Sequence, residues 1–299
     1  MRLDDFDPNA IDVDDQRGGS RGSGGGFRLP MGGGGGKLGC GTLIIIIIAA
    51  LVFKVDPSQL IGGMQGGGLG GETQPTQAQG GSSAEESCRI DEGSKQSCDA
   101  LSSLNKTWQP LLEQERVAFR RPPIHFYSQS GQSGCGAAQS AMGPFYCPTD
   151  NGIYLDTDFY RQMETELGAK GQFARFYVIA HEYGHHVQNL TGTSDQVRAL
   201  QERNPAAANR LSVRLELQAD CYAGLWAAKN SNLLDPGDME SGLNAASSIG
   251  DDKLMQSAGR RADEAAFTHG SSAQRKQWLR TGLESGTIAA CDTFADLRR

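Results

Sequence analysis

"FYVIAHEYGHHVQNLTG", residues 176–192, places three of the five histidines of the chain within six positions. His181, Glu182 and His185 form the pattern H-E-x-x-H. On a helix, residues four apart lie one turn apart on the same face, so both imidazoles can bind one metal ion. The glutamate between them can take a proton from a metal-activated water and deliver it to a leaving amine. The stretch therefore predicts a helix that carries a hydrolytic metal site.

A catalytic zinc site needs a third protein ligand and an open position for water. The longer signature H-E-x-x-H-x-x-G-x-x-H is absent, because Gln188 stands at its glycine position and no histidine follows at the required interval. The stretch "RLELQADCY" instead offers Glu216 and, one turn later, Asp220. We predict that Glu216 completes a set of two histidines and one glutamate around Zn²⁺. Asp220 is predicted to accept the free ring N–H of a zinc-binding histidine.

The other histidines have weaker claims to the chemistry. His186 is rotated by about 100° from its neighbour on a helix, so we predict a structural role for it. His269, in "FTHGSS", is a candidate donor to the oxyanion that forms when water attacks a peptide carbonyl. An ordinary histidine near a helix start is the alternative interpretation. Tyr154 is a weaker candidate for the same donor role.

The N-terminal part of the chain is rich in glycine and contains one apolar run. The 40 glycines are concentrated before residue 40 and between 61 and 83, in tracts that bury too little apolar surface to offset their ordering entropy. Between the tracts lies "CGTLIIIIIAALVF", which is close to the length of a membrane helix. A secretory signal peptide is the alternative, although the stretch that precedes the run is long for one. The predicted organisation is a disordered tail over 1–37, a transmembrane anchor over 38–54, a flexible linker over 55–87 and a zinc metallopeptidase domain over 88–299.

Charges beside the apolar run predict its orientation. Arg17, Arg21, Arg28 and Lys37 precede the run, whereas Lys54 alone follows it closely. Because positive residues favour the cytoplasmic side, we expect a cytoplasmic N-terminus. The chain is then a single-pass protein of the inner membrane with a periplasmic, or at least extracytoplasmic, domain.

Cysteines are consistent with an exported domain. Six of the seven lie after the apolar run, an even number that permits three disulfides in an oxidising compartment. Near neighbours can close two short loops, which leaves one long-range pair. The pairing favoured among 15 connectivities is Cys88 with Cys98, Cys135 with Cys147 and Cys221 with Cys291.

The pattern of the domain predicts an α+β fold that is mainly helical. One or two helices are expected over 95–119, where Pro110 threatens a break. Aromatic and β-branched residues predict a small antiparallel sheet, with a turn at "PTDNG". Its expected strands lie within 122–129, 143–147 and 152–156. Further helices are expected over 173–190, 206–230, 238–248 and 272–284, the last with Ser271 or Ser272 as its N-cap.

The pairing of "HEYGH" with "ELQAD" resembles zincin metallopeptidases that use a glutamate ligand. Together with "GCGAAQSAMGPFYCPTDNGIYLD", "ARFYVIAHEYGHHVQNLTG", "RLELQADCYAGLWA" and "FTHGSSAQR", it resembles the bacterial putative neutral zinc metallopeptidase family, whose members carry an N-terminal membrane anchor. The resemblance covers most of the chain and is weakest in the glycine tracts. It implies a zincin-like fold, zinc as cofactor and a peptide substrate that lies along the edge of the sheet.

The sequence thus predicts a membrane-anchored zinc endopeptidase. A zinc-bound water would attack an amide carbonyl, with Glu182 as general base and then acid. Expected partners are a peptide or protein substrate and membrane lipid, and the net charge of −7 argues against nucleic acid. The alternatives are a zinc-stabilised binding or scaffold module without catalysis and a hydrolase of a non-peptide envelope amide. Glu182, which a structural zinc site does not need, favours an enzyme.

Overall fold

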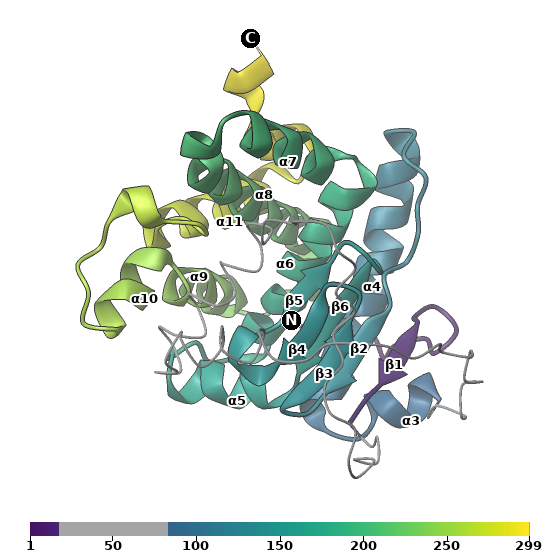
Figure 1. Cartoon of the computed structure of the whole chain (residues 1–299). Coiled ribbons are helices and arrows are strands. Elements are labelled where there is room, and N and C mark those ends of the chain that lie inside the picture. Colours follow the sequence, from purple (N-terminus) through teal and green to yellow (C-terminus); the bar gives the residue numbers. More distant parts are fainter. Residues whose placement is uncertain (18–82, 299) are drawn as a thin grey trace, which may run out of the picture.

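The helix that carries H-E-x-x-H lies at the centre of the molecule. The computed structural model describes residues 1–17 and 83–298. Helix α6 (Gln172–Leu190) packs against α4 (Glu92–Gln114), α8 (Ala208–Lys229) and α9 (Asp238–Ser248), and it also contacts the sheet (Figure 1). A helix enclosed by neighbours on several sides is buried around most of its circumference.

Helices make up most of the described chain, and the α+β prediction is confirmed. The remaining helices of more than one turn are α3 (Ala84–Cys88), α5 (Asp158–Thr165), α7 (Thr193–Arg203), α10 (Asp251–Ser257) and α11 (Ser272–Ser285). The four helices predicted from residue 173 onward agree with the structure to within two residues at each end.

Local signals explain two of these helix boundaries. Helix α6 stops before Gly192, which has a left-handed φ of 73° that suits glycine. Helix α11 begins after Ser271, whose side chain accepts the backbone N–H of Gln274 while the Gln274 side chain bonds back, a capping box. Pro110 does not break α4, which runs on to Gln114.

A four-stranded mixed sheet lies beside α6. Its strands are β1 (Val13–Asp15), β2 (Ile124–Tyr127), β5 (Phe145–Cys147) and β6 (Gly152–Asp156), in the order β1-β2-β6-β5. Strands β1, β2 and β6 are parallel, and only β5 runs antiparallel to β6. The prediction of an antiparallel sheet is therefore wrong except for the β5–β6 hairpin and a separate two-stranded hairpin, β3 (Ser130–Ser133) and β4 (Gly136–Gln139).

The reason is the number of reversals in the chain between β2 and β6. The chain turns back through β3, β4 and β5 before it enters β6, so β6 runs in the direction of β2 and pairs with it directly. Strand β5 thereby becomes an edge strand of the described sheet, whereas β6 lies inside it. Of the two strands of this hairpin, only β5 has a free edge among the described strands, at which a substrate could pair.

Helices α6 and α8 approach each other closely at the middle of the metal motif. Gly184 of α6 faces Ala219 of α8, and a Cβ added at Gly184 would lie 2.8 Å from the Ala219 Cα. Glycine therefore permits a backbone approach that any larger residue would prevent. This approach places the side chains of one helix opposite those of the other, including Glu216.

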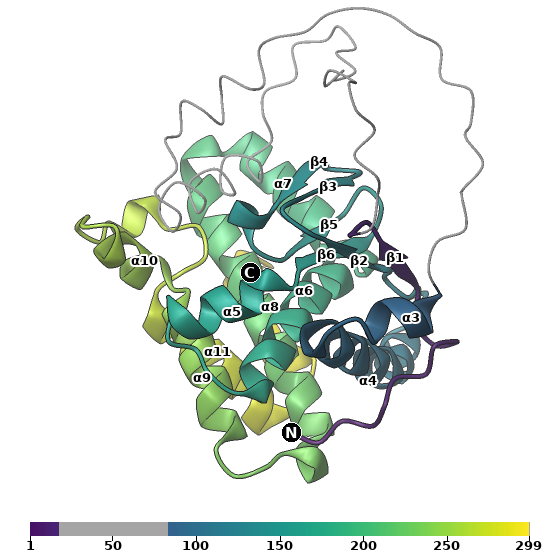
Figure 2. The same ribbon diagram turned by 90° about the horizontal axis from the view of Figure 1, so that it is seen from below.

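The N-terminal segment packs on the domain. Phe6 and Ile11 are 4% and 3% exposed and belong to the main hydrophobic core, and the Phe6 backbone N–H donates to Asp99 Oδ1 at 3.1 Å. Figure 2 shows the segment passing along α4 and ending beside β2 as strand β1. The prediction of a disordered tail over 1–37 is therefore wrong for residues 1–17. Burial of a few apolar side chains and one strand pairing order this segment, which contains no glycine and differs in this from the tract that follows it.

The predicted anchor over 38–54 lies outside the described residues, as does most of the predicted linker over 55–87. Residues 84–87 of that linker are helical, because they belong to α3, which has Ser83 as its N-cap. Across 1–17 and 83–298, none of the helices combines the length and the apolar character that crossing a membrane requires.

All three predicted disulfides are confirmed. Cys88–Cys98 joins α3 to α4, Cys135–Cys147 joins the β3–β4 turn to β5, and Cys221–Cys291 joins α8 to the C-terminal segment. The last closes the longest loop, 70 residues apart in sequence, and so removes the most freedom from the unfolded chain.

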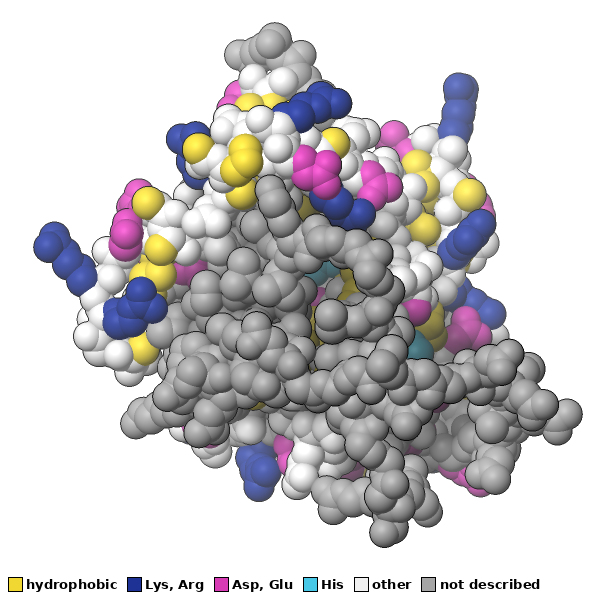
Figure 3. Space-filling view, in the orientation of Figure 1, with side chains coloured by type: hydrophobic (Ala, Val, Ile, Leu, Met, Phe, Trp, Pro, Cys, Tyr) yellow, Lys and Arg dark blue, Asp and Glu magenta, His cyan; other side chains and the backbone are white. Residues whose placement is uncertain are grey.

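Charge is dispersed on the face of the molecule shown in Figure 3. The lysine and arginine side chains visible there are scattered among aspartate and glutamate side chains and form no basic patch on the described part of that face. The face therefore offers no concentrated positive field.

Candidate metal centre and active site

Both histidines of the motif face Glu216 of α8. Glu216 Oε2 lies 3.2 Å from His181 Nε2, and its Oε1 lies 3.5 Å from His185 Nε2. One nitrogen or oxygen of each of the three residues lies within 4.8 Å of the others. Across the described ranges, this is the only group of three or more histidine, cysteine, aspartate or glutamate side chains that are so arranged. The three predicted ligands are thus brought together.

The donor set of this group fits zinc. Two imidazole nitrogens and one carboxylate are the protein ligands of a common class of catalytic zinc site, which keeps a further position open. Burial alone would lower the pKa of His181, but Asp220 and Glu216 outweigh it and raise that pKa to about 9. Burial also opposes the charge on His185, and Glu216 again raises its pKa. The carboxylates therefore favour a cation between these side chains, and a divalent metal would displace the protons.

A network of buried hydrogen bonds fixes the His181 ring on its Nδ1 side. Asp220, which is fully buried, accepts a hydrogen bond from His181 Nδ1 at 2.9 Å. This leaves Nε2 facing Glu216, as the prediction for Asp220 required. The same carboxylate also accepts from the Tyr177 hydroxyl at 2.5 Å and from Arg275. Orientation of the ring thus depends on residues of α6, α8 and α11.

His185 is oriented by a different residue, Gln188. The Gln188 Oε1 lies 2.9 Å from His185 Nδ1, so the ring nitrogen donates and Nε2 again faces Glu216. The Gln188 amide nitrogen in turn donates to the Leu215 carbonyl at 2.7 Å and to Gln218 Oε1 at 3.1 Å. Gln188 therefore ties the second histidine to α8, next to Glu216.

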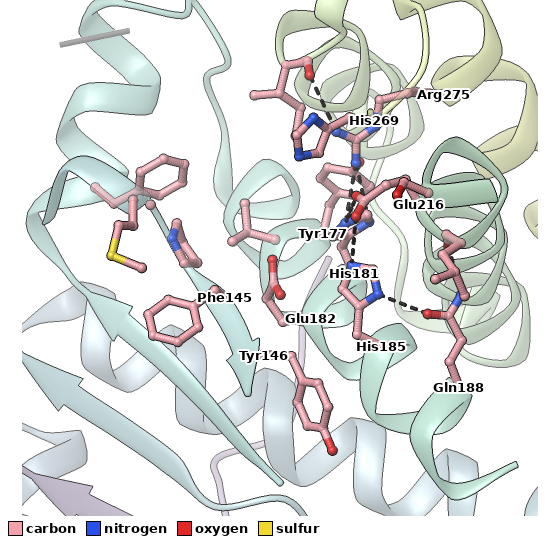
Figure 4. A pocket seen from close by; sticks show the side chains of 18 of the residues that line it. Phe145, Tyr146, Tyr177, His181, Glu182, His185, Gln188, Glu216, His269 and Arg275 are labelled. Atoms are coloured by element: carbon pink, nitrogen blue, oxygen red, sulfur yellow. Dashed lines mark hydrogen bonds and ion pairs between the residues drawn. The ribbon is translucent and has the colours of Figure 1, made fainter. Parts of the chain in front are cut away.

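Glu182 lines the same pocket as the three candidate ligands. Its carboxylate lies between the Phe145 ring and the two histidines (Figure 4). The side chain is 8% exposed, and burial raises the pKa of its carboxyl, against the opposing effect of the neighbouring histidines. This position, beside the candidate metal site and facing the cavity, is one from which a carboxylate can exchange a proton with a bound substrate or water.

His269 also lines this pocket, as the sequence predicted for a candidate donor. Figure 4 shows it near Glu216 and Arg275. Burial would raise the pKa of Glu216, but the neighbouring histidines, His185 more than His269, hold that pKa well below its usual range. Asp251 holds the loop that carries His269. Asp251 Oδ1 lies 3.1 Å from His269 Nδ1, and Oδ2 accepts the His269 backbone N–H at 2.7 Å together with those of both neighbouring residues.

Two other candidates lie outside the pocket. The Tyr154 hydroxyl donates to Asp150 at 2.6 Å, and its ring is stacked between His125 and Phe145, so Tyr154 does not supply a donor to this site. His186 is fully buried and lies 2.7 Å from the Arg120 carbonyl through Nε2. Burial lowers its pKa to about 4, and the ring lies outside the cavity, which is consistent with the predicted structural role.

Three residues that serve the site were not found from the sequence. Gln188 lies three positions after His185, a spacing at which helical side chains meet, so it had a local signal. Arg275 and Asp251 had none, because each meets its partner only after distant helices pack. Their partners Asp220 and His269 lie 55 and 18 residues away in the sequence.

The chain belongs to a family of zinc peptidases. The family described as "Putative neutral zinc metallopeptidase" matches residues 6–294, which is nearly the whole chain. The match begins within the N-terminal segment that packs on the domain and includes every candidate ligand.

Relatives with similar sequences carry names that assign no function. The chain is 43% identical to "Uncharacterized protein YpfJ" of Escherichia coli strain K12 over 288 residues, which cover 94% of this chain and 95% of that protein. It is 42% identical to "Uncharacterized protein Rv2575" of Mycobacterium tuberculosis strain H37Rv over 206 residues, which cover 64% of this chain and 68% of that protein. No solved structure matches this chain significantly.

Proposed function

We propose that this protein is a zinc-dependent endopeptidase of the zincin type. One observation supports the proposal above all others. His181 and His185 on α6 face Glu216 on α8, and Glu182 lines the same pocket. His181, His185 and Glu216 would hold the zinc ion. A bound zinc ion supplies Lewis acidity, which makes water a stronger nucleophile at neutral pH and polarises a carbonyl group.

Other side chains of the site transfer the proton, stabilise the developing negative charge and orient the ligands. Glu182 takes the proton of the attacking water on a carboxylate oxygen and passes it to the nitrogen of the leaving amine. His269 donates a hydrogen bond to the carbonyl oxygen as negative charge develops on it, from a loop held by Asp251. Asp220 and Gln188 accept hydrogen bonds from Nδ1 of the two histidines, which keeps the Nε2 atoms of both rings directed at Glu216.

A scaffold role explains the arrangement less well. A structural zinc site is closed by four protein ligands and has no use for a carboxylate beside an open cavity. Glu182 points into a cavity of about 390 Å³ instead. Hydrolysis of a peptide bond uses every one of these features.

The proposed location is the cell envelope, with attachment through the apolar run at residues 40–53. The three disulfides support it, because such bonds persist in oxidising compartments. Membrane lipid would then be a partner of the chain, beside its peptide substrate.

The test compares the purified full chain with Glu182→Gln and with Glu166→Gln, a control at an exposed glutamate outside the pocket. Zinc content is measured by elemental analysis, and hydrolysis is measured on unfolded casein. We expect about one zinc per chain in all three proteins. Hydrolysis should fall about 10²- to 10⁴-fold in Glu182→Gln alone, and a chelator should abolish it until zinc is restored. Equal hydrolysis by wild type and Glu182→Gln, or a chain that binds no zinc, would overturn the proposal.

A further inference from the structure

One wall of the cavity beside the candidate metal site is apolar. It is formed by side chains that come before and within β5, from α5 and the turn after it, and from α6. These side chains are Met142, Pro144, Phe145, Phe159, Leu167 and Val178. Figure 4 shows Phe145 on the far side of Glu182 from His181 and His185, so a substrate bond placed at Glu182 would have this wall beside it.

Packing contacts hold the side chains of this wall in place. The Phe145 ring is stacked on Tyr154, with ring centres 4.9 Å apart, and is 9% exposed. Val178 lies one helical turn before Glu182 and therefore on the same face of α6. Phe159 lies beside Gly143, where an added Cβ would be in ordinary van der Waals contact with the ring, at 3.5 Å. Side chains held in this way form a surface that exists before a ligand binds.

Charge in the cavity is confined to the chemical site. The acidic and basic side chains that line it are His181, Glu182, His185, Glu216, His269 and Arg275. Arg275 is 2% exposed and is paired with Asp220, so its charge is not available to a ligand. A peptidase that selects chain ends needs a fixed charge for the terminal amine or carboxylate. Among the described residues, the lining offers no such group apart from those that serve the chemistry.

We propose that the apolar wall is a specificity pocket, and that this enzyme cleaves interior peptide bonds next to a large apolar side chain such as leucine, phenylalanine or methionine. The inference rests on the proposed peptidase function. Such side chains are buried in folded proteins, so the substrates are unfolded or unstructured chains. The cavity of about 390 Å³ lies within the range of pockets that enclose ligands.

The test uses short fluorogenic peptides that differ only in one central residue: leucine, phenylalanine, alanine, aspartate or lysine. Each is made with free ends and with acetylated and amidated ends. For the wild type, kcat/KM should be about 10- to 100-fold higher for leucine or phenylalanine than for aspartate or lysine, which corresponds to about 1.4 to 2.8 kcal/mol. Blocking both ends should change kcat/KM less than about twofold.

A pair of variants connects the preference to the wall. Phe159→Ser removes a half-buried wall side chain, and Met239→Ser removes an apolar side chain that is 43% exposed and lies outside the pocket. Phe159→Ser should lose most of the preference for large apolar residues, whereas Met239→Ser should keep it. Equal cleavage of the charged and apolar peptides would overturn the inference while leaving the proposed endopeptidase intact. A requirement for a free end would overturn the cleavage of interior bonds, and with it the proposed endopeptidase, but not zinc-dependent peptide hydrolysis.

A binding experiment tests the specificity pocket independently of catalysis. The zinc-loaded Glu182→Gln variant is titrated with the same peptides, and binding is followed by fluorescence anisotropy. We expect the leucine peptide to bind more tightly than the aspartate peptide by the same factor of about 10 to 100. If this preference appears but the wild type hydrolyses none of the peptides, the pocket stands and the proposed catalysis fails. Binding that does not distinguish the peptides contradicts the pocket directly.

Discussion

The guanidinium group of Arg275 binds both carboxylate oxygens of Asp220, with Nε 2.8 Å from Oδ2 and Nη2 2.9 Å from Oδ1. The two side chains are 2% and 0% exposed. Because Asp220 also holds the ring of His181, this ion pair connects α11 to the candidate metal site on α6. An ion pair in this position serves orientation more than net stability, since burying both charges costs nearly as much as their attraction returns.

We expect Arg275→Met to lower the free energy of unfolding by about 3–5 kcal/mol, because it leaves the Asp220 carboxylate buried without its partner. Zinc affinity should fall about 10- to 100-fold, since the ring of His181 loses its fixed orientation. Chemical denaturation and competitive chelator titration measure the two effects. Arg161→Met, at a 73% exposed arginine, is the control and should change stability by less than about 0.5 kcal/mol. Equal effects of the two variants would show that the buried pair does not hold the site.

The approach of α6 to α8 at Gly184 supports a second prediction. In Gly184→Ala the new methyl group would lie 2.8 Å from the Ala219 Cα, a backbone atom that moves only if the helices separate. Separation would move Glu216 away from the histidines, so zinc affinity should fall by at least about tenfold, beside a stability loss of about 1–3 kcal/mol. Isothermal titration with zinc measures the affinity.

Gly242→Ala is the matched control for this variant. A methyl group there would lie 2.5 Å from the Phe173 ring, so it also overfills the core, but at the contact of α9 with α6 away from the ligands. It should lose stability without losing zinc affinity. If both variants weaken zinc binding equally, general loss of stability rather than helix separation is the cause.

These contacts show how far the sequence alone could lead. The ligands on α6 and α8 were predictable because their spacing on a helix is a local property, and Glu216 and Asp220 follow the same rule one turn apart. Helix ends were equally local, since Gly192 and Ser271 act within a few residues. The sheet was harder. Its parallel pairings join segments far apart in sequence, and no local pattern distinguishes them from hairpin pairings.

The N-terminal segment shows the same limit more clearly. Phe6 and Ile11 are isolated apolar residues within a polar stretch, and no periodic pattern marks them as core. They are buried because α4 offers them a surface, which depends on the rest of the fold. Arg275 likewise reads as an ordinary helical arginine until α11 packs against α8. Such long-range partners are set by tertiary contacts and could not be predicted from spacing.

A third prediction concerns the loop that carries His269. Asp251 accepts three consecutive backbone N–H groups of that loop and also faces the His269 ring. In Asp251→Asn an amide group replaces one acceptor oxygen, so at least one of these bonds is lost and the ring is no longer held. We expect kcat to fall about 10-fold or more, with zinc content unchanged, because the donor to the developing oxyanion is misplaced. His269→Ala should lower kcat further, by about 10²- to 10³-fold.

Asp252→Asn is the control for this prediction. Asp252 accepts the backbone N–H and the hydroxyl of Ser272, at 2.7 and 2.8 Å, so it also supports the start of α11, but it makes no contact with His269. Its kcat should stay within about twofold of the wild type. Steady-state kinetics with a fluorogenic peptide measures all three variants. A normal kcat in His269→Ala would remove the residue from the mechanism.

The fourth prediction follows from where the described N-terminal segment ends. Arg17 Nη2 donates to the carbonyl of Ser87 at 2.8 Å, and Nη1 lies 3.2 Å from Asp91 Oδ2. Ser87 belongs to α3, which begins directly after the segment 18–82, so both ends of that segment are held at the same place on the domain. The guanidinium also lies over the Phe126 ring of β2, 4.5 Å from its centre.

A chain that crosses a bilayer once has its two flanks separated by a hydrocarbon core about 30 Å thick. Flanks in direct contact cannot be so separated. We therefore expect residues 1–17 and residues 83–298 to lie on the same side of any membrane with which this chain associates. This differs from the expected combination of a cytoplasmic N-terminus with an exported domain, which would place Arg17 and Ser87 on opposite sides.

Thiol labelling in cells measures this arrangement. Asn9→Cys and Glu113→Cys, at exposed positions of the N-terminal segment and of α4, are each introduced with Cys40→Ser, because the other six cysteines are paired in disulfides. Cells are treated with a membrane-impermeant maleimide before and after permeabilisation, and Cys40→Ser alone gives the background. Both added cysteines should react before permeabilisation or both only after it, since one folded body carries them. Labelling of one position and protection of the other in intact cells would show that Met1–Arg17 is not docked on the domain in the cell.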